Sequence, residues 1–309
     1  MKILGIGNAI VDVICKVEEN FISQNNLTKS NMKLIFDENE FKNLLSNLKI
    51  EKTISGGSVA NSIVGLSQLG NEAGFIGKVS NDDFGIKYEN GLKKENVDFI
   101  YFKKNEVLPT GTCLILVTPD SERTMCTFLG IAGKINEDDI NINAVKKSEM
   151  IFLEGYLWDE GDPKKAFEKA INAANKVAMS LSDKFCVDRH KKHFLELVKN
   201  KLDITFANED EIRSLIDAKN FDDVIEFGKS IKKCLIITRG SKGAISINGE
   251  EVNEVGIENN LKLVDLTGAG DLFAAGYLHG YLNNLSFKDS LRKGTEMASK
   301  IIQQIGARL

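Results

Sequence analysis

Hydrophobic and polar positions divide the chain into two regions with different rhythms. In the first, short apolar runs between turn residues predict strands without intervening helices, at 99–103, 112–117 and 124–128. In the second, strand-like and helix-like segments alternate, with strands at 150–153, 179–181, 204–206 and 235–238 and helices at 163–177, 191–199, 209–216 and 224–231. This alternation predicts parallel strands joined by crossover helices.

The first hundred residues add a buried strand at 2–6, a helix from Val59 to Gly70, a strand at 73–79 and a helix at 83–95. Short strands at 15–17 and 33–36 flank a polar, Asn-rich stretch. We therefore expect a single domain over residues 1–309, with an α/β, doubly wound, mostly parallel sheet flanked by helices. The strands within 14–36 and 98–129 are expected to form a small antiparallel lid.

A glycine turn separates an apolar, strand-like run that begins at Leu263 from a helix that starts near Asp271. Gly268, Ala269 and Gly270 leave the backbone bare, so that successive N–H groups and the helix dipole can point at one anion. A carboxylate there repels phosphate unless it accepts a proton from an attacking hydroxyl, which makes Asp271 a candidate general base. Asp is also a favoured helix cap, and the turn alone leaves both interpretations open.

Two earlier turns carry further polar candidates. Asp12 follows Asn8 among apolar residues. It is either a cap at a strand end or, as we favour, a carboxylate that binds hydroxyl groups at the floor of a cleft. Gly56 and Gly57 lead into a helix whose first turn holds Asn61, an amide that can donate to and accept from a sugar hydroxyl. The same residues would also make an ordinary helix start.

The alternating region supplies turns at the carboxyl ends of its strands, where ligands of parallel sheets bind. The acidic segment 208–211 is equally consistent with a ligand site and with a well-capped helix. The segment 238–243 holds a glycine turn, a Thr hydroxyl and cations, and predicts either a phosphate cradle or a β-hairpin. Tyr156 and Trp158, shortly after Glu154, are either core aromatics or stack on a flat ligand.

Composition narrows the function classes. Hydrophobic residues make up 42% and charged residues 27% of the chain, which is ordinary for a folded globular protein. A formal net charge of −4 with scattered cations argues against nucleic acid, and no apolar run is long enough to span a bilayer. The 5 cysteines form no C-x-x-C pair and predict buried free thiols in a reducing cytoplasm. His190 and His193 lack matching ligands and indicate a solvated helix face rather than a metal site.

Taken in order, these turns resemble the signatures of the ribokinase-like, PfkB-type carbohydrate kinases. The resemblance covers nearly the whole chain and is carried by two segments, GGSVANSIVGLSQLG at 56–70 and DLTGAGDLFAAGY at 265–277. It implies a large α/β domain with a nine-stranded core sheet, a small β lid, and transfer of the ATP γ-phosphoryl group to a primary hydroxyl. The implied cofactors are ATP and Mg²⁺, with K⁺ as a further candidate.

The resemblance also implies a role for each candidate residue. Asp271 matches the catalytic base, and Gly268, Ala269 and Gly270 match the anion hole. The residues that match acceptor binders are Asn8, Asp12, Gly56, Gly57, Asn61 and Glu154. Those that match nucleotide binders are Asn208, Glu211, Thr238, Gly240 and Gly243.

Metal binding is implied in the same way. Glu211 would organise magnesium, and Asp265 and Thr267 match a monovalent-cation site. Leu266 replaces the Thr of the usual D-T-x-G-A-G-D form, which puts one side-chain oxygen in doubt. Phosphate contacts by Arg189 and Lys242 are left open.

Within the family, Gly7-Asn8 ahead of Asp12 and the run PTGTC at 109–113 look most like the adenosine kinases. The expected reaction is therefore the conversion of adenosine to AMP. Ribokinases and fructokinases are the alternatives, which Glu154 does not separate, and a catalytically inactive nucleotide-binding regulator is a remote third. The expected partners are ATP and a nucleoside or sugar, without nucleic acid or membrane, in a cytoplasmic monomer or homodimer.

Overall fold

The computed structural model describes residues 1–120, 122–158, 161–258 and 260–309, and in these residues the chain forms one β-sheet of nine strands and another of five. From edge to edge, the large sheet contains β14 (Glu251–Val255), β13 (Ala244–Asn248), β12 (Cys234–Thr238), β11 (Ile204–Asn208), β10 (Val177–Ser180), β9 (Met150–Glu154), β1 (Ile3–Ile6), β5 (Ala73–Ile76) and β6 (Val97–Phe99). Neighbouring strands from β12 to β6 pair in parallel, while β12, β13 and β14 pair antiparallel. The predicted mostly parallel sheet is confirmed.

Helices cover both faces of the large sheet because its central strands are apolar on both sides. In β9, Phe152 packs into one core cluster while its neighbours Ile151 and Leu153 pack into the other. The first cluster is covered by α3 (Ser58–Gln68), α4 (Asp83–Lys94), α10 (Ala269–Leu282) and α11 (Phe287–Ile301). The second is covered by α5 (Ile142–Lys147), α6 (Asp162–Ala173), α7 (Lys184–Asn200), α8 (Glu209–Ile216) and α9 (Phe221–Ile231).

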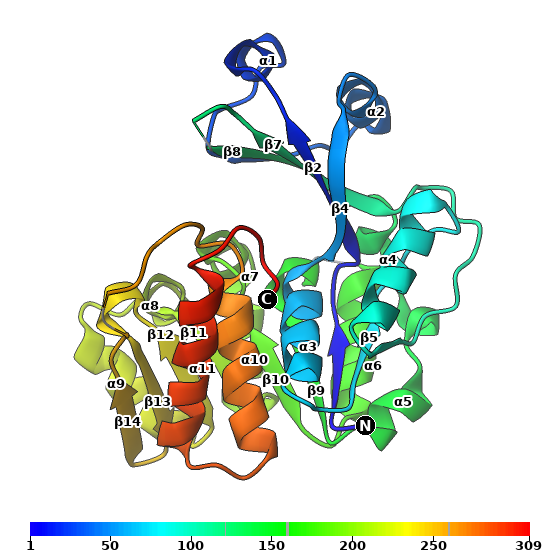
Figure 1. The fold of residues 1–309 in the computed structure, drawn as a ribbon. Helices are drawn as coiled ribbons and strands as arrows, with labels where there is room; N and C mark the ends of the chain where they lie inside the picture. The colour runs from blue at the N-terminus through cyan, green and yellow to red at the C-terminus, as the bar shows by residue number, and fades with distance from the viewer. Residues whose placement is uncertain (121, 159–160, 259) are drawn as a thin grey trace.

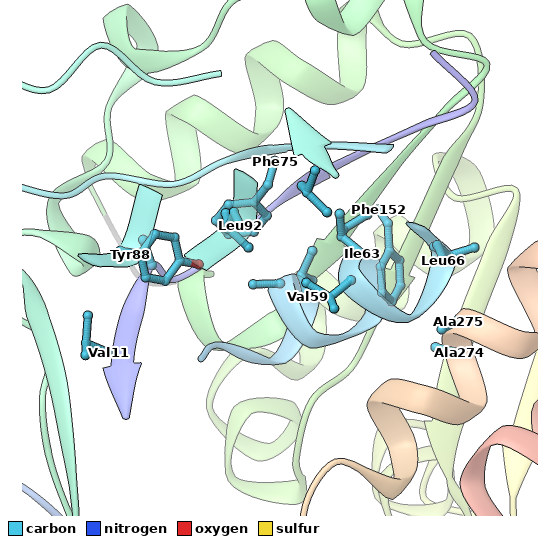
Figure 2. Packing of buried hydrophobic residues seen from close by; sticks show 14 of the residues in the cluster. Val11, Val59, Ile63, Leu66, Phe75, Tyr88, Leu92, Phe152, Ala274 and Ala275 are labelled. Atoms are coloured by element: carbon cyan, nitrogen blue, oxygen red, sulfur yellow. The ribbon is translucent and has the colours of Figure 1, made fainter. Parts of the chain in front are cut away.

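Helices α3 and α10 pack side by side. Ala274 and Ala275 of α10 lie beside Leu66 of α3 (Figure 2). Gly65 makes this close approach possible, because a Cβ there would come within 2.8 Å of Leu272 and 3.0 Å of Ala275. Small residues on the facing surfaces therefore set the distance between the two helices. None of the helices in the described residues is long and apolar enough to span a membrane.

The small sheet stands apart from the large one (Figure 1). It contains, in order, β3 (Met32–Leu34), β8 (Arg123–Phe128), β7 (Gly111–Val117), β2 (Ile10–Lys16) and β4 (Ile50–Gly56). Two short helices, α1 (Glu19–Gln24) and α2 (Glu38–Ser46), lie on its side away from the large sheet (Figure 1). Val11 and Val13 face these helices in the core, so the alternate residues of β2 face the large sheet.

The small sheet differs from the prediction in composition and in pairing. It is mixed rather than antiparallel, because β2 pairs with β7 in parallel, as β3 does with β8. Its strand β4 falls where the sequence indicates only a glycine turn, and β2 starts at Ile10 rather than near residue 14. The strand predicted at 99–103 is instead β6, which ends at Phe99 and belongs to the large sheet.

Two further predictions are wrong, and one open alternative is decided. The run that begins at Leu263 is not a strand; Leu263 and Leu266 are 65% and 68% exposed in an irregular loop. Trp158 is a core residue, 2% exposed and packed against aromatic rings of α6 and α7, so it cannot stack on a ligand. His190 is buried and does not share the solvated face of His193. The prediction of buried free thiols is confirmed for all the cysteines.

Candidate functional site

Helix α10 begins at a backbone turn that requires glycine. Gly268 caps the helix in the left-handed conformation, with φ 79°, and a Cβ there would come within 2.7 Å of the Ala307 backbone. The first N–H groups of a helix have no partner within it, and they lie at the positive end of its dipole. Space for a ligand exists beside Gly270, where a Cβ would meet nothing within 4 Å. The turn therefore offers a place for an anion.

Asp271 lies in the first turn of α10 and is held by two residues of α3. Ser58 Oγ donates to Oδ1 at 2.6 Å, and Asn61 Nδ2 donates to Oδ2 at 3.0 Å. A third α3 residue, Ser62, donates its hydroxyl to the Asp271 backbone carbonyl at 2.9 Å. The close packing of α3 on α10 thus fixes the carboxylate beside the anion site.

The protonation of Asp271 is set by opposing effects. Burial raises its pKa, while the hydrogen bonds from Ser58 and Asn61 and the charge of Arg308 lower it. Burial outweighs these effects, so the pKa of Asp271 lies above its ordinary value, which is the direction that favours a general base. The geometry therefore suits proton acceptance, and it does not show the helix cap that the sequence left open, because Gly268 is the N-cap and the Asp271 carboxylate is bound by α3 side chains.

Asp12 lies on β2, on the face of the small sheet that looks toward α10. A Cβ on Gly56 would come within 2.4 Å of Asp12 Oδ2, so glycine in β4 leaves the room that the carboxylate occupies. Burial raises the pKa of Asp12 to about 7; the charge of Arg308 lowers it and that of Asp271 raises it. The two aspartates are thus close enough to influence each other.

Glu154, at the end of β9, and Asn8, just after β1, are joined by hydrogen bonds near the start of α3. Glu154, 1% exposed, accepts the backbone N–H of Asn8 at 2.9 Å and its Nδ2 at 2.8 Å through Oε1, and the backbone N–H of Val59 at 3.1 Å through Oε2. Burial raises its pKa to about 7, against these hydrogen bonds. Because both oxygens are used inside the protein, the geometry favours a positioning role for Glu154 over the expected contact with the acceptor. It ties the end of β1 to the start of α3.

The residues expected at the nucleotide lie together at the carboxyl ends of two neighbouring strands. Asn208 of β11 is the register partner of Thr238 of β12. Asn208 and Glu211 form a capping box in which Glu211 accepts the Asn208 backbone N–H at 3.0 Å and its Nδ2 at 2.6 Å. Burial raises the pKa of Glu211 to about 7. The capping alternative is therefore what the structure shows for this segment.

The turn after Thr238 is a short 3₁₀ turn, Gly240–Lys242, that joins β12 to β13 as a hairpin. Gly243 has φ 84°, and a Cβ there would come within 2.0 Å of the Val255 carbonyl. Lys242 Nζ lies 3.8 Å from a Glu209 carboxylate oxygen. The hairpin alternative is thus the observed geometry.

Asp265 does not fit a monovalent cation in this arrangement. Its Oδ1 accepts the N–H and the hydroxyl of Thr267 at 3.0 and 2.7 Å, and its Oδ2 accepts the Gly306 N–H at 2.8 Å. Oδ2 also pairs with Arg123 of β8 at 2.6 Å. Burial by itself would raise the pKa of Asp265, but these donors outweigh it and hold the pKa below its usual value. The Arg123 guanidinium supplies the positive charge there and ties the small sheet to the loop before α10.

Magnesium also finds no preformed set of ligands. Both Glu211 oxygens are used by the capping box, and the described residues contain no group of three or more His, Cys, Asp or Glu side chains placed to hold a metal. Mg²⁺ retains several waters and is commonly held by substrate phosphates with one or two carboxylates. A magnesium ion that arrives with a nucleotide is therefore compatible with this site.

Comparison with known proteins decides the family. The sequence pattern of the pfkB family carbohydrate kinases matches residues 6–309. The chain belongs to this family. The match includes every element that forms the Asp271 cluster, and it makes the protein a phosphotransferase with an alcohol group as acceptor. Membership of this family implies ATP as the phosphoryl donor, accompanied by Mg²⁺.

Relatives of this kinase carry different substrate names. The crystal structure of an adenosine kinase from Sinorhizobium meliloti is 35% identical, with a TM-score of 0.89, over 100% of this chain and 95% of that one. A probable sugar kinase from Rhizobium etli CFN 42 is also 35% identical, with a TM-score of 0.89, over 99% and 94%. Adenosine kinase 2 of Arabidopsis thaliana is 25% identical over 98% of this chain and 94% of its own. These likenesses support the kinase fold without separating the acceptors.

Three residues of the kinase site were missed in the sequence. Ser58 directly follows the Gly56-Gly57 turn, and its position at the start of a helix was a usable signal. Arg123 and Arg308 gave no local signal, because they reach the site from strand β8 and from the segment after α11. Contacts of this kind depend on the tertiary fold.

Proposed function

We propose that this protein is an adenosine kinase that transfers the γ-phosphoryl group of ATP to the primary hydroxyl of the nucleoside. The observation that carries the proposal is a row of side chains across the small sheet. Asp12, Cys113, Thr127 and Leu34 are register partners on β2, β7, β8 and β3. Partners in register project to the same face, so the row runs from a carboxylate to an apolar end.

The next row on the same face is apolar throughout. It consists of Ile14, Ile115, Met125 and Met32. A cavity of about 390 Å³ lies at the Leu34 end of the first row, on the side away from the second row. It is lined by the apolar residues Leu34, Phe36, Phe128 and Pro163 and by the charged residues Glu38, Lys134 and Asp162. Cavities of this size hold small ligands, and the apolar part of this lining suits a flat ring system.

The spacing of strands supports a nucleoside over a free sugar. Neighbouring strands lie about 4.8 Å apart, so roughly 10–14 Å separate Asp12 from the end of its row at Thr127 and Leu34. Asp12 would bind the ribose hydroxyls, and the base would extend over the apolar surface. A monosaccharide would fill the region near Asp12 and leave this surface exposed to water.

The proposed chemistry uses the Asp271 cluster. Asp271 takes the proton of the acceptor hydroxyl while the oxygen of that hydroxyl forms a bond to the γ-phosphorus. At the same time, the bond between the γ-phosphorus and the β–γ bridging oxygen breaks. ADP leaves with the electron pair of that bond. The N–H groups at Gly268–Gly270 stabilise negative charge on the transferring group. Bound Mg²⁺ supplies positive charge at the phosphates.

The small sheet is proposed to act as a lid. Its inner face bears Asp12, and Arg123 links it to Asp265 beside the anion site. Closure over the acceptor would exclude water, which otherwise competes as the nucleophile. Hydrogen exchange on residues 10–16 and 111–117 tests this: protection should rise with adenosine and a nonhydrolysable ATP analogue together, and unchanged exchange would contradict it.

The acceptor is tested by steady-state kinetics with adenosine, ribose and fructose. We expect kcat/KM to be highest for adenosine. The alternative is a sugar kinase, which the likeness to the probable sugar kinase of Rhizobium etli CFN 42 supports. A preference for a free sugar by more than about tenfold, or roughly 1.4 kcal/mol, would refute the adenosine assignment in favour of that alternative.

A further inference from the structure

Arg308 extends from the segment after α11 into the middle of the Asp271 cluster. Its Nε donates to Asn61 Oδ1 at 3.0 Å, and Asn61 in turn donates to Asp271. Its Nη2 is buried and has no hydrogen-bond partner among the described residues. A buried donor of a charged group that lacks a partner costs free energy, and such groups are usually found where a ligand completes them.

Four contacts fix the segment that carries this arginine. Gly306 donates its N–H to Asp265, and Ala307 packs against the Gly268 turn. Gln304 Nε2 donates to the Arg308 carbonyl at 2.9 Å, and Gln68 Nε2 of α3 donates to the Leu309 carbonyl at 3.2 Å. The guanidinium is therefore held at the site by its own backbone, and not merely attracted to it.

Charges around the guanidinium indicate what it binds. Asp12 of β2, Asp271 of α10, Tyr88 of α4 and Glu95, just after α4, all interact with it electrostatically. Two of these carboxylates flank the space where a phosphoryl group must pass between donor and acceptor. Without a positive charge, that space would repel the anionic group that is transferred.

We propose that Arg308 is a further catalytic residue, whose Nη2 binds an oxygen of the γ-phosphoryl group during transfer. This inference rests on the proposed kinase reaction at Asp271 and adds a contact to it. A planar guanidinium can keep Nε on Asn61 while Nη2 faces a phosphoryl oxygen. Interactions that stabilise charge on the transferring group raise kcat more than they change acceptor affinity.

Its effect on Asp271 gives an independent readout. The charge of Arg308 lowers the Asp271 pKa and opposes the effect of burial. A nearby positive charge favours the ionised form of a carboxyl group. Loss of the arginine should therefore move the acidic limb of the kcat–pH profile to higher pH.

The test compares Arg308→Gln and Arg308→Lys with wild type and with Arg292→Gln, a control at an exposed arginine of α11 that pairs with Asp289. With adenosine and ATP, Arg308→Gln should lower kcat by about 10²–10³-fold and change the KM for adenosine by less than about threefold. Arg308→Lys should retain the pH profile, because it keeps the charge. Arg292→Gln should match wild type.

Nucleotide binding decides the question even if adenosine is not the acceptor. Calorimetry measures the affinities for ADP and for the nonhydrolysable analogue AMP-PNP. Arg308→Gln should weaken AMP-PNP at least about tenfold relative to ADP, since only the analogue carries a γ-phosphoryl group. A wild-type protein that phosphorylates neither nucleosides nor sugars would refute the proposed function. The ratio of the affinities for AMP-PNP and ADP would still test the role of Arg308.

Several outcomes would overturn the role of Arg308. Equal weakening of ADP and AMP-PNP, with a lowered Tm, would make it a structural residue. An increase in kcat in Arg308→Gln would mean that the arginine blocks the acceptor space. A folded variant with wild-type kcat, pH profile and nucleotide preference would show that it does not take part in transfer.

Discussion

The contact between Gly56 and Asp12 gives a sharp steric test of the acceptor site. A Cβ on Gly56 would come within 2.4 Å of Asp12 Oδ2, about 1 Å closer than ordinary contact between nonbonded heavy atoms. Gly56 does not adopt a positive φ, so Gly56→Ala perturbs the site through this atom and not through backbone strain. The carboxylate must move away, together with its contact to the acceptor.

The expected size follows from the lost interaction. A hydrogen bond to a charged group contributes about 1.5–3 kcal/mol, so kcat/KM for the acceptor should fall by about 10–100-fold. The loss should appear mainly in KM, because Asp12 is proposed to bind the acceptor in the ground state and the transition state alike. Crowding in a packed sheet should also lower stability by roughly 1–3 kcal/mol.

The assay is steady-state kinetics at a temperature where the variant is shown to be folded by circular dichroism. Gly256→Ala is the matched control, because a Cβ there would meet nothing within 4 Å and its φ is not positive. The control should retain wild-type kinetics. Wild-type KM in folded Gly56→Ala would refute the reasoning, because Asp12 would then not act from the position that Gly56 leaves open.

The remaining predictions concern pH and ions. Burial raises the pKa of Glu154 and of Glu211 to about 7 from 4.5, so the folded state keeps protons that the unfolded state releases. Unfolding free energy should therefore fall as pH rises from about 4.5 to 7, by at most about 1.4 kcal/mol per pH unit per carboxyl. Urea unfolding should show a weaker fall in Glu154→Gln; an identical fall would exclude Glu154 as a source. Because Arg123 occupies Asp265, kcat in K⁺ and in Na⁺ at equal ionic strength should agree within about twofold. Strong activation by K⁺ would show that a cation displaces Arg123.

The sequence predicts correctly those elements that depend on neighbouring residues alone. The Gly268–Gly270 turn and Asp271 fall at the start of α10 as expected, since glycine at a left-handed helix cap and a polar first turn are short-range features. The parallel sheet was also predicted, because strand-like and helix-like segments alternate along the second half of the chain. In contrast, the apolar residues of the loop that begins at Leu263 predict a strand, although no strand of the large sheet pairs with that loop in the described residues.

The site itself depends on contacts that sequence separation hides. Ser58 and Asp271 are 213 residues apart, and Asn61 and Arg308 are 247 apart. Glu154 shows the same limit, because its position at a strand end suggested a ligand contact while the fold places it under the turns that it holds. Such roles follow from burial and hydrogen-bond partners, which only the tertiary structure provides.

The role of Asp271 is tested most directly by Asp271→Asn, which preserves the shape of the side chain and removes the base. Asp289→Asn is the control, since Asp289 also lies in the first turn of a helix and is exposed. We predict that kcat with adenosine falls by about 10²–10⁴-fold in folded Asp271→Asn, with little change in acceptor affinity, and stays unchanged in the control. Near-normal kcat in folded Asp271→Asn would contradict the account and leave Asp271 as a structural residue that ties α10 to α3.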